Sequence, residues 1–307
     1  MVSLQTFNNI TQTRHGDIYD CVDIYKQPAF VHPLLKDHKI QMNPSFSKAQ
    51  DVQNATSPST ITIGLMEKEC PKGSVPIRRV TKEERTRAET SFREQFQDSY
   101  SIKAVCRIFN KTGSGTHYAA GGAVSVNNPK VAPGQLSGSV LSIEGGPPDQ
   151  FSTIRVGWIV NINQFGDSRT RLYSIWGQAT NGVMHGCYNT DCPVSVPGGT
   201  QYFVNLQLQL DKASGNWWLI YAGSTKIGYW PSSLFINLKV VPVFFDGEVR
   251  EIGIDDQSGS SLDEPAVALL EKLEMGCYKV GDIYKKDDYH GYRFWFGGSG
   301  GDVQQCS

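Results

Sequence analysis

Leucine and glutamine alternate strictly at the end of the stretch 201–210, and this pattern constrains the fold more than any other feature of the chain. A period of two is that of an extended strand, because successive side chains point to opposite faces. The stretch predicts a strand with Leu206, Leu208 and Leu210 on one face and amides on the other, then a hairpin turn at 211–215. Many short strands are typical of an antiparallel sandwich or barrel. Further strand-like runs occur at 153–160, 170–176, 216–221 and 292–296.

Composition places the chain among globular proteins. Of its 307 residues, 39% are hydrophobic and 11% aromatic, which is enough for a core and too much for a disordered chain. The formal net charge of -1 leaves no excess of Lys and Arg for phosphates, so nucleic acid is not an expected partner. The richest apolar run, 238–245, is interrupted by Lys239 and Pro242, so no membrane span is expected. The first nine residues lack a basic and apolar leader, and we expect the natural signal peptide to be absent from this sequence.

Charge is distributed unevenly along the chain. Residues 1–116 carry 16 Lys and Arg against 12 Asp and Glu, whereas the remainder carries 13 against 18. Opposite net charges favour docking of the first segment on the second, and acid would weaken that docking by protonating carboxylates. A chance imbalance between two solvated surfaces is the alternative.

Three segments follow one another. Residues 14–80 are rich in Pro and His and predict a small unit without a large core of its own. Residues 80–96 are highly charged and free of Gly and Pro, which predicts an exposed helix or helical linker. It is either the region of proteolytic processing or an ordinary solvated surface helix. A second helix is expected at 262–276, where acidic residues precede the run 267–273 and Gly276 follows it. The predicted boundaries are 14–80, 81–116 and 117–306.

The cysteines favour an oxidising compartment. Cys187 and Cys192 enclose four residues, a loop that a disulfide closes with little rearrangement, while Cys277 and Cys306 bracket the C-terminal segment. Cys21 and Cys70 form the remaining pair in the first segment. Cys106 is left over in a strand-like alternation; a buried free thiol is expected, with an intermolecular bridge or a reactive site as alternatives. The spacings do not fit a zinc site, so neither a metal nor a cofactor is expected.

Other surface features agree with secretion. N-glycosylation triplets begin at Asn9, Asn54 and Asn110, all within the first 112 residues. All six tryptophans lie between Trp158 and Trp295, where they form either a packed core or an aromatic cleft for a glycan or peptide; the core is the favoured interpretation.

Several blocks of sequence resemble the plant neprosin-domain family. The runs 20–30, 32–35, 38–42 and 70–79 are similar to its activation segment. Downstream, five blocks are similar to the family's peptidase domain. They are Gly157-Trp158, Gly186-Cys-Tyr-Asn189 with Cys192, Gly215-Asn-Trp-Trp218, Gly228-Tyr-Trp-Pro231 and Gly247-Glu-Val249. The blocks stand in order from about residue 14 to residue 306.

The resemblance implies an all-β protein: an antiparallel β-sandwich of two sheets, a small disulfide-stapled N-terminal prodomain at 14–80 and few short helices. It implies a secreted proprotein, extracellular, apoplastic or vacuolar, whose inhibitory prodomain is bound to a peptidase domain at 117–306 that cleaves peptides, often after proline, in acid. It also implies the disulfides Cys21–Cys70, Cys187–Cys192 and Cys277–Cys306.

The family's chemistry uses two glutamates that face each other across the cleft of the sandwich, where paired carboxylates share a proton in acid. The first glutamate belongs two residues before the Gly-Trp pair, where this chain has Arg155. The second is placed at the position of Phe244, or at Glu248 if that block's own glutamate is the second acid. An arginine stays protonated and cannot act as a base. The segment after Glu248 also departs from the family's longer glycine-rich stretch, which puts substrate recognition in doubt.

The sequence therefore predicts a catalytically inactive homologue whose cleft, rimmed by aromatic residues such as Trp158, Tyr229 and Trp230, binds an extended peptide or another extracellular partner. One alternative is an active acid endopeptidase that uses displaced carboxylates at Glu144, Asp246 or Glu248. A structural ion pair between Glu248 and Arg155 is a further hypothesis. The second alternative is a protein that binds cell-wall carbohydrate.

Overall fold

The computed structural model describes residues 10–12, 17–46, 70–87, 90, 102–110, 118–133, 135–147, 150–178, 203–221, 225–238, 243–250, 254–262, 268–274, 278–280, 284–287 and 291–298. For residues 10–12, 102–110, 123–125, 203–204 and the strands after residue 238, it describes the course of the backbone alone. Every strand pair within these ranges is antiparallel.

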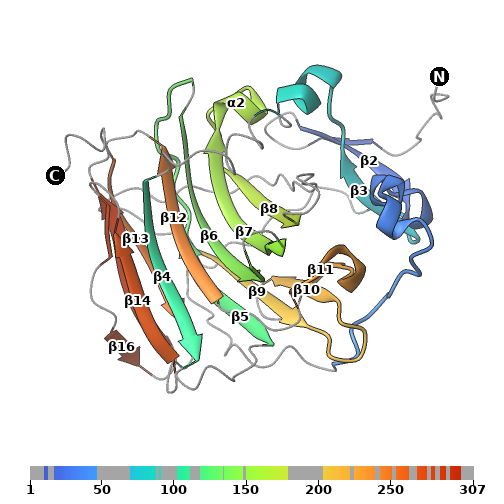
Figure 1. Ribbon diagram of the computed structural model, residues 1–307. Helices are drawn as coiled ribbons and strands as arrows, with labels where there is room; N and C mark the ends of the chain where they lie inside the picture. Colours follow the sequence, from blue (N-terminus) through green and yellow to red (C-terminus); the bar gives the residue numbers. More distant parts are fainter. Residues whose placement is uncertain are drawn as a thin grey trace.

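Two large sheets form the body of the protein (Figure 1). The six-stranded sheet has the order β14 (Ala268–Glu274), β4 (Ile102–Asn110), β12 (Val243–Arg250), β6 (Leu136–Gly145), β7 (Ser152–Asn161) and β8 (Arg171–Gln178). The eight-stranded sheet has the order β11 (Thr225–Trp230), β10 (Trp217–Tyr221), β9 (Phe203–Leu210), β5 (Ala119–Ser125), β13 (Ile254–Leu262), β17 (Gly291–Gly298) and β15 (Tyr278–Val280), and β16 (Tyr284–Asp287) pairs with β17. The all-β antiparallel sandwich predicted from the sequence is confirmed.

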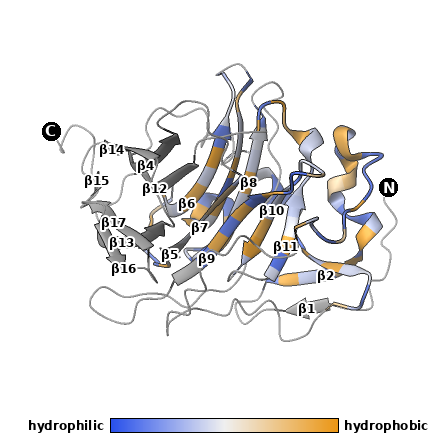
Figure 2. Cartoon of the chain, turned by 90° about the horizontal axis from the view of Figure 1, so that it is seen from below, coloured by the Kyte–Doolittle hydropathy of each residue, from blue (hydrophilic) through white to orange (hydrophobic). Residues whose placement is uncertain are grey.

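The core lies between these sheets because both present apolar side chains at every second position. Leu206 and Leu208 of β9 pack with Ile154, Val156 and other inward-facing residues of β7 in one buried cluster. Figure 2 shows hydrophobic and hydrophilic residues alternating along β9. The predicted alternation of β9 is therefore confirmed, although Gln207 and Gln209 on its other face are also buried.

The predicted hairpin turn is also present. The Gly215 N–H donates to the Asp211 carbonyl oxygen at 2.7 Å, and Leu210 then pairs with Trp217. Gly215 has a φ of 76°, a left-handed conformation that a glycine adopts without strain.

A smaller N-terminal unit lies beside β8 and β11. Its three-stranded sheet consists of β1 (Ile10–Gln12), β2 (Ile18–Asp23) and β3 (Ser74–Arg78). Three short 3-10 turns follow β2, namely η1 (Ile24–Lys26), η2 (Pro28–Val31) and η3 (Pro33–Leu35). Residues 82–87 form an exposed helix, as the sequence predicts. Two further short elements belong to the sandwich: α2 (Ile162–Phe165) and η5 (Ser232–Leu234).

One predicted element is wrong. The run 267–273 was expected to be helical, but residues 268–274 form strand β14, in which Leu269 pairs with Phe109 and Leu273 with Val105 of β4. Pairing with an available edge strand outweighs the local helix propensity of Ala, Leu, Glu and Lys.

No helix within the described ranges is both long and apolar enough to cross a bilayer.

Candidate functional site

The catalytic positions predicted from the sequence lie on the outer face of the six-stranded sheet, the face turned away from the eight-stranded sheet. Along β7 the even-numbered side chains from Ile154 to Val160 enter the core between the sheets. Ile159 instead packs with Tyr173 and Ile175 of β8 in a second buried cluster. Because strand side chains alternate, Arg155 shares the face of Ile159.

Strand register places both predicted glutamate positions in one row across this outer face. Phe244 of β12 lies opposite Ser142 of β6, and Ser142 lies opposite Arg155 of β7. Directly opposed residues of antiparallel strands point to the same side. The two positions are therefore two strand spacings apart, about 9 to 10 Å. This row contains a phenylalanine, a serine and an arginine where an acid pair would need two carboxylates.

Arg155 forms an ion pair within this face. Its Nη2 lies 3.0 Å from Oε1 of Glu144, and only 13% and 15% of the two side chains are exposed. Register explains the contact, since Glu144 lies opposite Thr153, two residues along the strand from Arg155. The structure thus pairs Arg155 with Glu144, while the side chain of Glu248, the partner considered from the sequence, lies outside the described part.

The remaining candidate acids lie farther along β12. Asp246 and Glu248 stand opposite Val140 and Gly138, so both occupy the outer face in the next two rows. Their side chains lie outside the described part of the structure. Among the side chains that are described on this face, no two carboxylates meet.

A hollow adjoins the ion pair on the same face. It has room for about one water molecule and is bordered by Arg155 together with Leu136, Gly138, Val140, Trp158, Ile159 and Tyr173. The side chain of Trp158 itself belongs to the core between the sheets. Arg155, the one cation of this lining, is paired with Glu144. No cluster of three metal-ligating side chains occurs in the described part of the chain.

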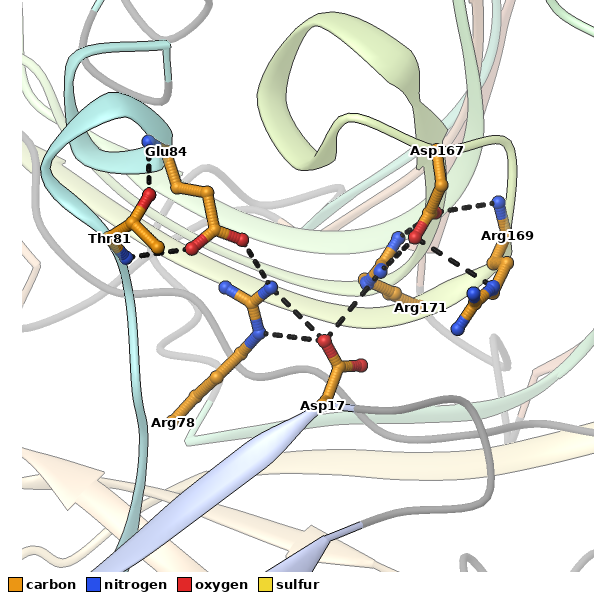
Figure 3. A network of polar contacts seen from close by, with 7 residues as sticks. All are labelled: Asp17, Arg78, Thr81, Glu84, Asp167, Arg169 and Arg171. Carbon is orange, nitrogen blue, oxygen red and sulfur yellow. Dashed lines mark hydrogen bonds and ion pairs between the residues drawn. The ribbon is translucent and has the colours of Figure 1, made fainter.

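The N-terminal unit contacts the sandwich through an ionic cluster near α2 (Figure 3). Arg78 of the N-terminal unit pairs with Asp17 at 3.1 Å and with Glu84 at 2.9 Å. Arg171 of β8 lies 3.8 Å from Asp17 and binds both oxygens of Asp167 at 2.5 and 2.7 Å. Asp17 therefore joins the arginines of the two parts.

The ionic cluster also shifts the pKa values of Glu84 and Asp167. Burial alone would raise the pKa of Glu84, but bonds from the Thr81 backbone and from Arg78 lower it below the usual range. The pKa of Asp167 is likewise lowered, because bonds from Arg171 and Arg169 outweigh burial. Thr81 and Glu84 also form a reciprocal capping box at the start of the helix at 82–87.

A second contact involves residues 28–46, which we call the strap. Leu35 is buried in the core cluster of the sandwich, and His32 packs edge-on against Trp176 at 5.5 Å between ring centroids. Farther along, the ring of His38 is 2.8 Å from the Tyr229 hydroxyl, which also accepts the Gln41 N–H at 2.8 Å.

Asp211, in the hairpin turn between β9 and β10, anchors the end of the strap. Its side chain is fully buried. The carboxylate accepts three hydrogen bonds from the strap: from the Ser45 N–H at 2.8 Å, from the Gln41 side-chain amide at 2.5 Å, and from the Ser45 hydroxyl. Burial alone would raise its pKa, but the hydrogen bonds from Ser45 and Gln41 hold the pKa far below its usual range. Sequence reasoning found the turn but missed this role, because no local signal links Asp211 to a segment about 170 residues away.

Comparison with known families agrees with this two-part organisation. A sequence model of the neprosin activation peptide matches residues 10–122, and one of the neprosin domain matches residues 133–265. The chain belongs to the neprosin-domain family. Its neprosin domain makes it a glutamic-peptidase-like protein. Its N-terminal unit lies within the match to the activation peptide, which also covers β4 and the first part of β5.

Solved structures give weaker similarities to this neprosin-domain chain. It is similar to scytalido-glutamic peptidase with a peptide-based transition-state analogue (TM-score 0.38, 7% identity, 64% of this chain and 98% of that one). A second structure of that peptidase, with a transition-state analogue inhibitor, gives a TM-score of 0.37 at 9% identity over the same shares. A β-porphyranase from the human gut bacterium Bacteroides plebeius gives 0.26 at 8% identity, over 64% of this chain and 74% of that one. The fold assignment rests on the strand order of the chain itself.

The aromatic rim expected for the neprosin-domain cleft is not seen. Trp158 is 2% exposed and Trp230 9% exposed, and both side chains belong to the core between the sheets. Tyr229 is bound by the strap. Trp158 follows Arg155 by three residues, so the alternation of the strand turns it to the opposite face.

Of the predicted disulfide and glycosylation sites, one disulfide is present and the others lie outside the described side chains. The Cys21–Cys70 disulfide is present, as the resemblance implied. Cys106 lies in β4 and Asn110 is the last residue of that strand, but their side chains are outside the described part. Also outside it are Cys187, Cys192, Cys277, Cys306, Asn9 and Asn54.

Proposed function

We propose that this chain is a secreted neprosin-domain protein that has lost the family's acid–base peptidase chemistry and retains a site for an extended peptide. The observation that carries the proposal is the ion pair between Arg155 and Glu144. Peptide hydrolysis by paired glutamates needs one carboxylate to accept a proton from water while the other donates one. A guanidinium does neither at any relevant pH, and its ion pair occupies the neighbouring carboxylate of Glu144.

The match to the neprosin domain over residues 133–265 supports the binding role. The family's domain holds peptides, and this chain keeps that domain while it lacks the expected acid at position 155. The Cys21–Cys70 disulfide supports secretion, because such bonds persist in oxidising compartments.

A peptidase assay tests the loss of activity. The purified protein is incubated with proline-containing peptides between about pH 2 and 6, where carboxylate pairs titrate. An active member of the family serves as the positive control. We expect no cleavage by this chain. Cleavage that co-purifies with the protein and disappears in Glu144→Gln would overturn the proposal and favour displaced carboxylates.

Calorimetry with the same peptides tests the binding role separately. We expect binding to the intact protein, weakened in Tyr173→Ala, which removes an aromatic side chain close to Arg155 on the outer face. Lys226→Ala, an exposed change on the other sheet, is the matched control and should bind as the unaltered protein does. If none of the peptides binds, the binding role fails while the loss of catalysis stands on its own assay.

A further inference from the structure

We propose that the edge of the sandwich formed by β8, the β9–β10 turn and β11 is a permanent recognition surface for the strap. The N-terminal unit would then stay bound after the chain between the two parts is cut, as an integral part of the folded protein. This inference does not depend on the proposed function, because its test measures association and not catalysis.

The strap completes the core between the sheets. Leu35 is only 5% exposed and belongs to the same buried cluster as Leu234 and Phe235. Phe30 packs against that cluster from the same segment. Release of the strap would expose these apolar surfaces and the face of Trp176 that His32 covers. Separation is therefore opposed by the free energy of exposing apolar surface to water.

The strap also satisfies polar groups that are buried in the sandwich. Asp211 accepts hydrogen bonds from Ser45 and Gln41, while the Asn216 side-chain amide donates to the Gln41 side-chain oxygen at 2.7 Å. Asn216 is 5% exposed and Asp211 is fully buried. Loss of the strap would leave both without these partners, and unmade hydrogen bonds at buried groups are costly.

A third attachment lies at the other end of the N-terminal unit. Arg171 is 3% exposed and reaches Asp17, which also pairs with Arg78. The strap and this ionic cluster hold the same unit at separate places. When one contact opens, the other keeps the local concentration high, so the two together bind far more tightly than either alone.

The test is a cut in the connection between the two parts. A recognition sequence for a site-specific protease is inserted between residues 91 and 100 of the full-length protein, which is cleaved after folding. The cut protein is then passed over a size-exclusion column at pH 7 and about 1 µM, a concentration at which only submicromolar complexes stay together. We expect the two fragments to co-elute. Fragments that separate would overturn the proposal.

Two neighbouring leucines provide a matched pair of variants. Leu35 is buried in the core, whereas Leu34 is 50% exposed. In the cut protein, Leu35→Ala should raise the dissociation rate of the N-terminal fragment more than tenfold, and Leu34→Ala should leave it within about twofold. Equal rates for both variants would contradict the assigned surface.

A polar variant covers the case in which Leu35→Ala does not fold. Gln41→Ala with Ser45→Ala removes the two side-chain donors to Asp211 and leaves the Ser45 N–H and the core unchanged. Met42→Ala, 63% exposed on the same segment, is its control. The double variant should also release the fragment more than tenfold faster. An unchanged rate in the double variant would overturn the proposal.

Discussion

At the residue scale, Arg155 changes what the outer face can do. The row that it shares with Ser142 and Phe244 holds a cation, a hydroxyl and an apolar ring. Glu144, the carboxylate within reach, serves as the counter-ion of the arginine. The ion pair is largely buried, and burying each charge costs free energy. The attraction between the two charges offsets that cost only while both groups are present.

Breaking this pair should be costly. We expect Arg155→Met to lower the free energy of unfolding at pH 7 by about 3 kcal/mol, because Glu144 is left buried without its cation. The double variant Arg155→Met with Glu144→Gln should recover most of that loss. Urea denaturation measures both.

A matched control exists in Arg169, which is 45% exposed and lies 3.7 Å from Asp167. Arg169→Met should change the free energy of unfolding by no more than about 0.5 kcal/mol. A loss in Arg155→Met no larger than in this control would contradict the structural role of the pair.

The sequence located Arg155 but not its partner. Position 155 was found because the family resemblance places a glutamate two residues before the Gly-Trp pair. Its pairing with Glu144 depends on the register between β6 and β7, which no local pattern encodes. Trp158 illustrates the same gap, since it was expected at the rim of the cleft and the alternation of the strand turns it into the core.

At the scale of elements, strands with clear alternation were predictable and elements without it were not. The period of two in β9 led directly to its inward-facing leucines. The run Ala268–Glu274 lacks such alternation and consists mostly of good helix formers, so its identity as strand β14 follows only from pairing with β4.

The pairing of β6 with β7 depends on a close approach at Gly157. A Cβ atom there would lie 2.0 Å from the Ser139 carbonyl oxygen and 2.7 Å from the Cα of Val140. Gly157→Ala should therefore lower the free energy of unfolding by about 3 kcal/mol, measured by urea denaturation, because backbone atoms must move apart.

Gly73 is a suitable control because a Cβ atom added there would meet no atom within 4 Å. Its φ of +86° still disfavours alanine, so only the backbone conformation opposes the substitution. Gly73→Ala should cost about 1 kcal/mol from backbone strain alone. Equal costs at the two glycines would show that the close approach at Gly157 is not a constraint.

At the scale of the whole molecule, the contacts between the two parts do not follow their net charges. The first 116 residues are net positive, yet their Asp17 approaches Arg171 of the net negative part. The buried Asp211 in turn accepts hydrogen bonds from the uncharged Ser45 and Gln41. Local pairing, and not overall charge asymmetry, accounts for these contacts.

Acid should nevertheless loosen the strap. The pKa of Asp211 is lowered in the bound state, because the hydrogen bonds from Ser45 and Gln41 outweigh burial, so its contribution is present above about pH 4 and is lost as the pH falls further. Burial lowers the pKa of His38, so protonation below about pH 6.5 also favours release. Protonation of Asp211 and protonation of His38 therefore both favour release of the strap.

Hydrogen exchange of the Gln41 and Ser45 backbone N–H groups at pH 7, 5 and 3 measures this effect. After correction for the intrinsic pH dependence of exchange, we expect protection to fall with pH. Asp211→Asn should show less protection at pH 7 and a smaller further loss below about pH 4. Protection that increases on acidification would contradict the assignment.

The disulfide between Cys21 and Cys70 closes a ring of chain that contains the whole strap. One peptide bond broken inside this ring opens it without detaching a piece, because both new ends remain linked through the sulfur atoms. The strap thus lies inside a covalently closed loop. A single cut separates the strap from the sandwich part of the chain only if the cut lies after residue 70. Damage to the strap and separation of the N-terminal unit are therefore distinct events in this protein.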